Sequence, residues 1–399
     1  MAGTSIHIGA KAPVGPTAFE PKKAIRSGKK LNIIEQLNYY LALLTPIKTA
    51  DKVSFFRLLA TMINAGISIV KALDILAEQT ENVHMKKVVK GLVEKIESGN
   101  SFSEAMSEYH DVFSEAQIGM VESGEASGRL NQTLLQIATE TEKSAALVSK
   151  IKSAMIYPAV IFVLMIGAGF AVMTYVMPRI KEMFESLGGQ LPVSTVALIN
   201  LSDFLVSTTL GVSNSLWLVV AIIAIIGIFL WWKKTKLGAM LWAKAVLKFP
   251  VFGKLSKKVA LARFCRGLST MIASGISIIK ALNITATSVG NPVYERRIRQ
   301  IADDVKQGIT MAENMKDDTK HFPTMVVGMV GVAEQTAQID SITGKLADYY
   351  EEEVSDTVKG LSALIEPMIL VVIGGAVAFL VISVMLPILS ASDLATAAA

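Results

Sequence analysis

Three long stretches of the chain are apolar and nearly free of charge. Residues 154–178 carry no charge, residues 216–232 have tryptophans near both ends, and residues 364–389 hold Glu366 as their only charged side chain. A helix of about 20 apolar residues crosses the hydrocarbon core of a bilayer, and tryptophan is enriched where such helices meet water. The pattern therefore predicts three transmembrane helices rather than buried core helices.

Outside these stretches, apolar residues recur at the spacing of amphipathic helices. One apolar stripe runs along residues 55–63 and ends at Gly66, which suits the left-handed conformation that follows a helix. Ser68 can cap the next helix, and further along Ser101 and Glu104 form a capping-box pattern. Strand-like alternation is scarce. We therefore predict an all-α protein with helical bundles of about six helices each outside the membrane.

One segment of the sequence occurs twice. RLLATMINAGISIVKAL at residues 57–73 matches RGLSTMIASGISIIKAL at residues 266–282 at 12 of 17 positions, with an offset of 209 residues. The same offset continues without a gap into the first and third apolar stretches. The duplicated unit is therefore a helical domain with the span that follows it, and a last helix over residues 130–152 is expected to run straight into the first span.

Two glycines and two prolines occupy matching positions in the two copies. Gly66 and Gly275 are expected to close the turn between the first two helices of each domain. Pro158 and Pro367 are expected to mark bends where the domain helices enter the membrane.

The apolar stretch without a counterpart meets a topological requirement. Two like domains share one side of a membrane only if the chain crosses it an even number of times between them, and the first copy already ends in one crossing. The second stretch supplies the return. The predicted organisation is a basic, disordered tail (1–50), a first cytoplasmic domain (51–153), a transmembrane helix (154–178), an external connection (179–215), a transmembrane helix (216–232), a cytoplasmic basic linker with the second domain (233–363), a transmembrane helix (364–389) and an external tail (390–399).

Charge placement gives the expected orientation. Residues 233–260 hold eight lysines and no acidic residue, whereas residues 179–215 hold two basic and three acidic residues. Because basic residues favour the cytoplasmic side, the N-terminus and both domains are expected in the cytoplasm and the C-terminus outside. The single cysteine, Cys265, excludes an internal disulfide and agrees with a reducing compartment.

Composition fits a chain that is partly membrane and partly soluble. The hydrophobic fraction of 52% and the mean hydropathy of +0.48 are high for a soluble protein, while 18% charged residues is high for a chain lying wholly in the membrane. The net charge of +5 is mild for nucleic-acid binding, and no nucleic-acid partner is expected. Residues 1–30 are polar and basic, without the apolar core of a signal peptide.

Catalytic patterns are missing from the sequence. The four histidines lie far apart and without metal-ligand spacing, and Gly344-Lys345 is followed by Leu346 rather than the hydroxyl residue of a phosphate loop. We therefore expect no enzymatic activity, no metal and no cofactor.

The motifs FFRLLATMINAGISIVKAL, ESGEASGRL and MIYPAVI in the first copy, with FCRGLSTMIASGISIIKAL and LIEPMIL in the second, resemble the inner-membrane platform proteins of type IV pilus and type II secretion machines. The resemblance covers residues 50–390. It implies a scaffold in the inner membrane that contacts a hexameric-type assembly ATPase in the cytoplasm, pilin or pseudopilin subunits in the membrane, other machine components and further copies of itself. Pilus, secretion and DNA-uptake machines remain open.

Two departures from the family pattern stand out. GEASGRL in the first copy becomes AEQTAQI in the second, which keeps Glu334 but loses both glycines. Residues 1–50 also lack the short strand-forming leader, with a tyrosine-glycine pattern, that family members often carry.

Several polar residues are candidates for partner contact. Glu366 has Tyr157 as its counterpart in the repeat. One interpretation is that Glu366 caps a helix that begins at Pro367. The other is that it makes a polar contact that guides a pilin segment or pairs protomers. Gly124, Glu125 and Gly128, with Glu334 in the second copy, form either a helix connection or an exposed partner-binding turn. The remaining candidates are three acidic residues, Glu351, Glu352 and Glu353. They form either a solvated helix face or a surface that meets a basic surface of the ATPase.

Two other classes of function compete with the platform. A transporter or channel subunit would need polar residues lining its spans, and only Glu366 offers a charge there. A signalling receptor would need a larger outer sensing domain than residues 179–215 provide.

Overall fold

The computed structural model describes residues 46–187, 193–209, 212–250 and 252–397. Most of the predicted N-terminal tail, residues 1–50, lies outside these ranges.

The described part of each repeat consists of six helices. The first repeat contains α2 (Thr49–Asn64), α3 (Ile69–Gln79), α4 (Val83–Glu97), α5 (Phe102–Ser107), α6 (Glu115–Ala126) and α7 (Leu130–Ala171). The second contains α12 (Phe252–Ala273), α13 (Ile278–Ser288), α14 (Pro292–Lys306), α15 (Met311–Lys316), α16 (Thr324–Gln335) and α17 (Ile339–Ala397). From α3 and α13 onward, each helix begins 209 residues after its counterpart. The two six-helix domains predicted from the repeat are confirmed.

Local signals fix the turns of both domains. Gly66 and Gly275 adopt φ angles of 81° and 78°, where a side chain would strain the backbone. Ser101 accepts from the Glu104 amide while the Glu104 carboxylate accepts from the Ser101 amide, as the capping box predicts. Ser68 stands at the N-cap of α3, but its side chain makes no capping hydrogen bond.

The two domains share one hydrophobic core. Phe55 and Phe113 in the first repeat have ring centroids 5.9 Å apart, and their counterparts Phe264 and Phe322 have the same separation. The buried cluster that contains both pairs runs from one repeat into the other without interruption. The bundles are therefore packed into one body.

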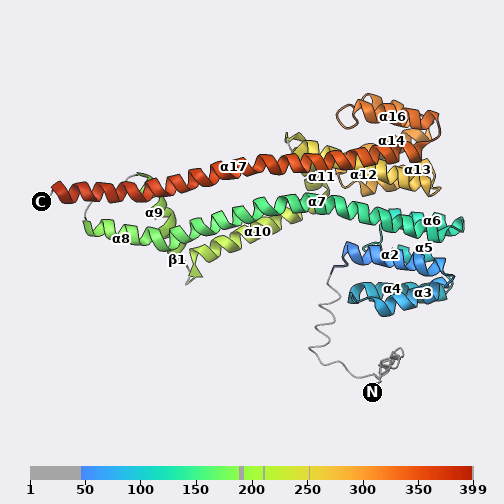
Figure 1. The fold of residues 1–399 in the computed structure, drawn as a ribbon, viewed down its shortest axis with the longest axis horizontal. Coiled ribbons are helices and arrows are strands. Elements are labelled where there is room, and N and C mark those ends of the chain that lie inside the picture. Colours follow the sequence, from blue (N-terminus) through green and yellow to red (C-terminus); the bar gives the residue numbers. More distant parts are fainter. Residues whose placement is uncertain (1–45, 188–192, 210–211, 251, 398–399) are drawn as a thin grey trace, which may run out of the picture. The chain divides into compact units, whose positions relative to one another are not determined.

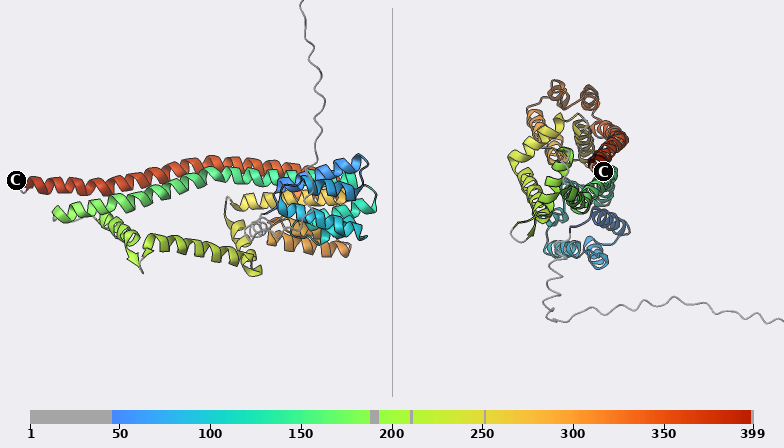
Figure 2. Two further views of the ribbon diagram at one scale, coloured as in Figure 1. Left: turned by 90° about the horizontal axis from the view of Figure 1, so that it is seen from below. Right: turned by 90° about the vertical axis from the view of Figure 1, so that its left-hand side faces the viewer.

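Among the residues that the structure describes, three helices are long and apolar enough to cross a membrane, and two of them extend directly from the domains. The last helix of each domain continues as its span, so α7 and α17 lie side by side and run in the same direction (Figures 1 and 2). Pro158 lies inside α7 and Pro367 inside α17, and both helices continue through the proline. The third candidate, α10 (Asn214–Lys234), exposes its side chains from Leu216 to Lys234.

The described part of the connection after the first span is mainly helical. A π-helical turn, η1 (Val172–Val176), leads from α7 into α8 (Met177–Leu187), and α9 (Val193–Val206) packs back against it. Ser202 in α9 donates to the Met173 carbonyl in η1 at 2.5 Å. Two short antiparallel strands, β1 (Thr208–Thr209) and β2 (Val212–Ser213), pair Thr208 with Ser213 before α10, and α11 (Lys236–Lys248) leads on to α12.

Candidate functional site: the joint between the repeats and the paired spans

The two domains meet at a joint formed by α6 and α7 of the first repeat and α12 and α13 of the second. At its centre Gly119 is buried, and a Cβ there would lie 3.2 Å from Ile284 Cδ1 and 3.8 Å from Ile276 Cδ1. These two isoleucines are 8% and 7% exposed. The absence of a side chain at Gly119 lets both isoleucines pack directly against the backbone of α6.

Polar contacts surround this apolar centre. Ser123 Oγ donates to the Ser274 carbonyl at 2.5 Å, and Gln136 Nε2 donates to the Thr270 carbonyl at 3.4 Å. At the edge, Lys280 Nζ lies 2.8 Å from Glu122 Oε2. The joint is therefore closed by hydrogen bonds to the last turn of α12 as well as by apolar packing.

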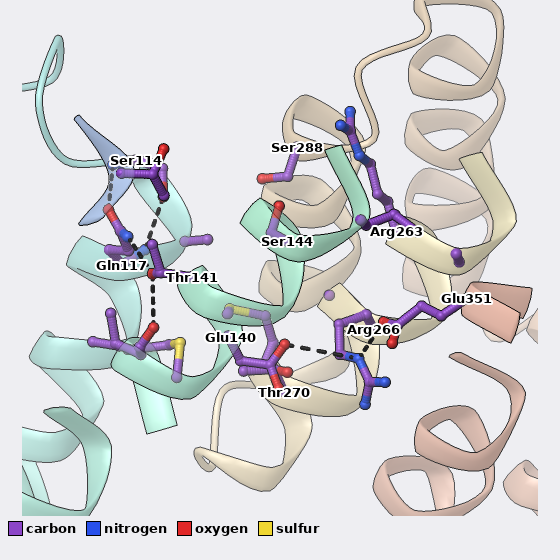
Figure 3. A pocket seen from close by; sticks show the side chains of 18 residues that line it. Ser114, Gln117, Glu140, Thr141, Ser144, Arg263, Arg266, Thr270, Ser288 and Glu351 are labelled. Atoms are coloured by element: carbon purple, nitrogen blue, oxygen red, sulfur yellow. Dashed lines mark hydrogen bonds and ion pairs between the residues drawn. The ribbon is translucent and has the colours of Figure 1, made fainter. Parts of the chain in front are cut away.

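Beside the joint, a cavity of about 380 Å³ opens between the repeats, lined mainly by α6 and α7 of the first and α12 of the second (Figure 3). Arg266 of α12 points into it: Nε lies 2.9 Å from Glu351 Oε1 and 3.8 Å from Glu140 Oε2, and the guanidinium also contacts Asp348. Arg266 thus connects α12, α17 and the α7 helix of the other repeat.

The charged groups in this cavity, together with burial, shift one another's pKa values. Burial raises the pKa of Glu140 above its ordinary 4.5, against Arg266 and Lys143, which favour the carboxylate. Burial would lower the pKa of the Arg266 guanidinium, but the hydrogen bonds that it donates to the Glu351 and Asp348 carboxylates outweigh burial and raise that pKa. The arginine therefore stays charged, and burial favours the protonated form of Glu140.

The acidic run on α17 is not a uniformly solvated face. Glu351 is engaged by Arg266, and Glu353 Oε2 lies 2.5 Å from Lys258 Nζ. Glu352 is exposed. The expectation of a solvated face is therefore wrong for Glu351 and Glu353, because α12 packs against α17 and places a basic side chain opposite each of them.

Glu125 and Glu334 occupy equivalent positions. The Glu125 carboxylate accepts from the amides of Phe102 at 2.7 Å and Ser103 at 2.9 Å, and so caps α5. Glu334 caps α15 in the same way, through amides located 209 residues further on. Both carboxylates thus support the fold of their own domain, and their contact with a partner stays a prediction.

The glycines beside Glu125 have separate roles. Gly124 lies inside α6, where a Cβ would stand 2.5 Å from Thr133 Oγ1 of α7. Gly128 is in the turn between these helices, with φ at 67°. In the second copy Ala337 replaces Gly128 yet keeps φ at 54°. The turn is therefore preserved without its glycine, at a cost in backbone strain.

The paired spans form an apolar groove of about 420 Å³ between α7 and α17. Pro158 and Phe162 contribute from α7, and Met368 and Val372 from α17. Because the side chains on both helices are largely exposed, the groove opens toward the surroundings of the spans.

Tyr157 and Glu366 are both exposed on these helices, and neither lines the groove. The interpretation of Glu366 as the cap of a proline-started helix is wrong, because α17 begins at Ile339 and Glu366 lies well inside it. The helix dipole therefore does not stabilise this carboxylate.

Some residues of the joint carried a sequence signal and others did not. Arg57 and Arg266 are paired with Glu142 and Glu351 at the same offset of 209, so the repeat could have pointed to both ion pairs. Ser123 and Gln136 bind across the repeats, and their counterparts are different residue types. Nothing in the repeat could have revealed them.

The fold defines a class: a helical membrane protein built from two copies of a domain with a trailing span. Comparison with known families agrees. The family model described as "Type II secretion system (T2SS), protein F" matches residues 55–178 and again residues 264–387. The chain belongs to this family, and the family together with the three apolar helices of the described residues makes it an inner-membrane protein.

Individual relatives cover most of the chain. It is 38% identical over 344 residues to the type IV pilus assembly protein PilC of Myxococcus xanthus, covering 86% of this chain and 81% of that protein. The corresponding protein of Thermus thermophilus is 36% identical over 338 residues, covering 85% and 82%. The type II secretion system protein F of Aeromonas hydrophila is 29% identical over 380 residues and covers 95% of each.

Proposed function

We propose that this chain is the inner-membrane platform of a type IV pilus or type II secretion machine, and that it couples a cytoplasmic assembly ATPase to the insertion or extraction of pilin or pseudopilin subunits. One observation carries the proposal: two domains related by the family repeat each continue as one unbroken helix into their own span. The names of the relatives support the same assignment.

The proposed orientation places both domains in the cytoplasm and the C-terminus outside. The eight lysines of residues 233–260 support it. Lys233 and Lys234 end α10, where they suit the cytoplasmic surface of the membrane.

The geometry suggests how movement would pass from the ATPase to the membrane. The joint and Arg266 hold the two domains together, so a push on either domain is transmitted to both. Because α7 and α17 run from the domains into the spans, the spans would move with the domains as one body. The exposed Glu352 remains a candidate for ATPase contact, together with other surface residues of the domains.

The groove between the paired spans is the proposed path of a pilin helix. Its apolar lining suits a helix that already lies in the bilayer, since such helices associate through close packing. Tyr157 and Glu366, near the groove but outside it, would supply polar contacts to the same segment or to a neighbouring protomer.

Three measurements test this function. Deleting the gene should abolish fibre assembly or secretion, and the ATPase should co-purify only with chains that retain the domains. Ala159→Phe, which fills the groove, should reduce assembly, whereas Val163→Phe on an exposed part of the same helix should not. Fibre assembly that survives deletion of the gene would refute the platform.

A further inference from the structure

The joint between the repeats uses different surfaces on its two sides. The first repeat contributes α6 with Gly119, and the second contributes α12 and α13 with Ile276 and Ile284. Such a heterologous contact leaves one unused surface on each partner: the α16 surface of the second repeat and the α2–α3 surface of the first.

Both unused surfaces keep the residues that form the centre of the joint. Gly328 on α16 is the counterpart of Gly119, and no heavy atom of the residues that the structure describes lies within 4 Å of the position its Cβ would take. Ile67 and Ile75 are the counterparts of Ile276 and Ile284, and they are only partly buried. The chain therefore carries a second, open copy of each half of its own joint.

The α16 surface is more apolar than its closed counterpart. Met325 is 43% exposed and Val332 is 48% exposed on either side of Gly328. The serine pair of the closed joint, Ser123 and Ser274, corresponds to Val332 and Ala65. Exposed apolar side chains arranged around a glycine favour burial against another protein surface.

Two charged side chains at the edges of these surfaces suit the helix ends that they would meet. Gln136, which donates to the last turn of α12, corresponds to Lys345, which would face the last turn of α2. A lysine at a helix C-terminus is favoured by the helix dipole. Thr287, which faces Glu115 at the start of α6, corresponds to Glu78, which would face the start of α16. An acidic residue at a helix N-terminus is favoured in the same way.

We infer that a second copy of this chain docks through these surfaces, with α16 of one copy seated on α2 and α3 of the next, Gly328 against Ile67 and Ile75. The movement that would place the first repeat on the second carries α7 onto α17, and these two helices lie parallel and side by side (Figure 1). Applying the same movement once more places the spans of the next copy parallel to those of the first. The docked copies can therefore share one membrane.

Cysteine cross-linking tests this contact in membranes. Val332→Cys and Ala65→Cys are placed on separate, differently tagged chains and co-expressed; both positions are exposed, and the native Cys265 is fully buried. We expect a disulfide-linked heterodimer under mild oxidation, in a yield similar to the intrachain link of a Ser123→Cys, Ser274→Cys chain. Failure of the heterodimer while the intrachain link forms would overturn the inference.

Two controls separate this contact from others. Val332→Cys alone should not form a homodimer, because the surfaces are different; an equal yield from the single variant would indicate a symmetric contact and contradict the inference. Gly328→Trp has room in the monomer and should abolish the heterodimer, whereas Gln300→Trp on the exposed part of α14 should not. A link from Val332→Cys to another protein in place of a second copy would also overturn it.

Discussion

Arg266 Nε lies 2.9 Å from Glu351 Oε1, and 209 residues earlier Arg57 forms the same pair with Glu142 at 2.6 Å. The two ion pairs differ in surroundings, since the Arg266 side chain is 16% exposed and the Arg57 side chain 52%. We predict that Arg266→Ala lowers the free energy of unfolding by about 1.5–3 kcal/mol, and that Arg57→Ala lowers it by about 0–1 kcal/mol. Denaturant unfolding of the detergent-solubilised protein measures both, and equal effects would contradict the role of Arg266 at the joint.

Glu140 should give the joint a dependence on pH. Burial raises its pKa above 4.5 in the folded protein, so the folded state binds this proton more tightly than the unfolded chain. Stability contributed by Glu140 is therefore present below pH 4.5 and is lost as pH rises through the raised pKa. Glu140→Gln should remove this part of the pH profile. Melting temperatures across that range test it, and an unchanged slope in the variant would count against the shift.

Ala337 holds a left-handed backbone conformation that its counterpart Gly128 adopts without strain. Ala337→Gly should therefore stabilise the second domain by about 1 kcal/mol, and Gly128→Ala should destabilise the first by a similar amount. Thermal unfolding of the two variants checks this pair. If both substitutions shifted stability in the same direction, backbone strain would not be the cause.

Glu125 and Glu334 each accept two backbone amides at the start of a short helix. Replacing either with alanine leaves these donors unpaired and should cost about 1–3 kcal/mol of stability. Glu352→Ala, on the exposed part of the acidic run, should change stability by less than about 0.5 kcal/mol. Proteolysis rates of the purified protein report the difference. Loss of ATPase binding without loss of stability would instead indicate direct partner contact.

The repeat made most of the fold predictable. Gly66 and Gly275 are matched at the offset of 209 residues between the two copies. Matching turns are expected in both copies, because the same local capping and turn preferences act on both segments. The joint was not predictable in the same way. Ser123 bonds to Ser274, but their counterparts are Val332 and Ala65, so the contact depends on how the folded domains approach each other.

The prolines show where a local rule failed. Pro367 after Glu366 suggested a helix start, since proline is favoured in the first turn. In the structure α17 continues through both residues. Proline is tolerated inside membrane helices, where neighbouring groups compensate for the missing hydrogen bond. The continuous helix from the domain into the span therefore decides the conformation of Glu366 and Pro367, and the local preference of proline for a helix start does not.

The central claim is that both repeats lie on one side of the membrane and the connection between the spans on the other. Labelling of introduced cysteines with a membrane-impermeant maleimide tests it most directly, because burial raises the pKa of the Cys265 thiol to about 12 and keeps it unreactive. Lys90→Cys, Gln300→Cys and Leu201→Cys place exposed thiols in the first domain, the second domain and the connection. In intact spheroplasts we predict labelling of Leu201→Cys alone, with the other two labelled only after lysis. Labelling of either domain from outside would contradict the account.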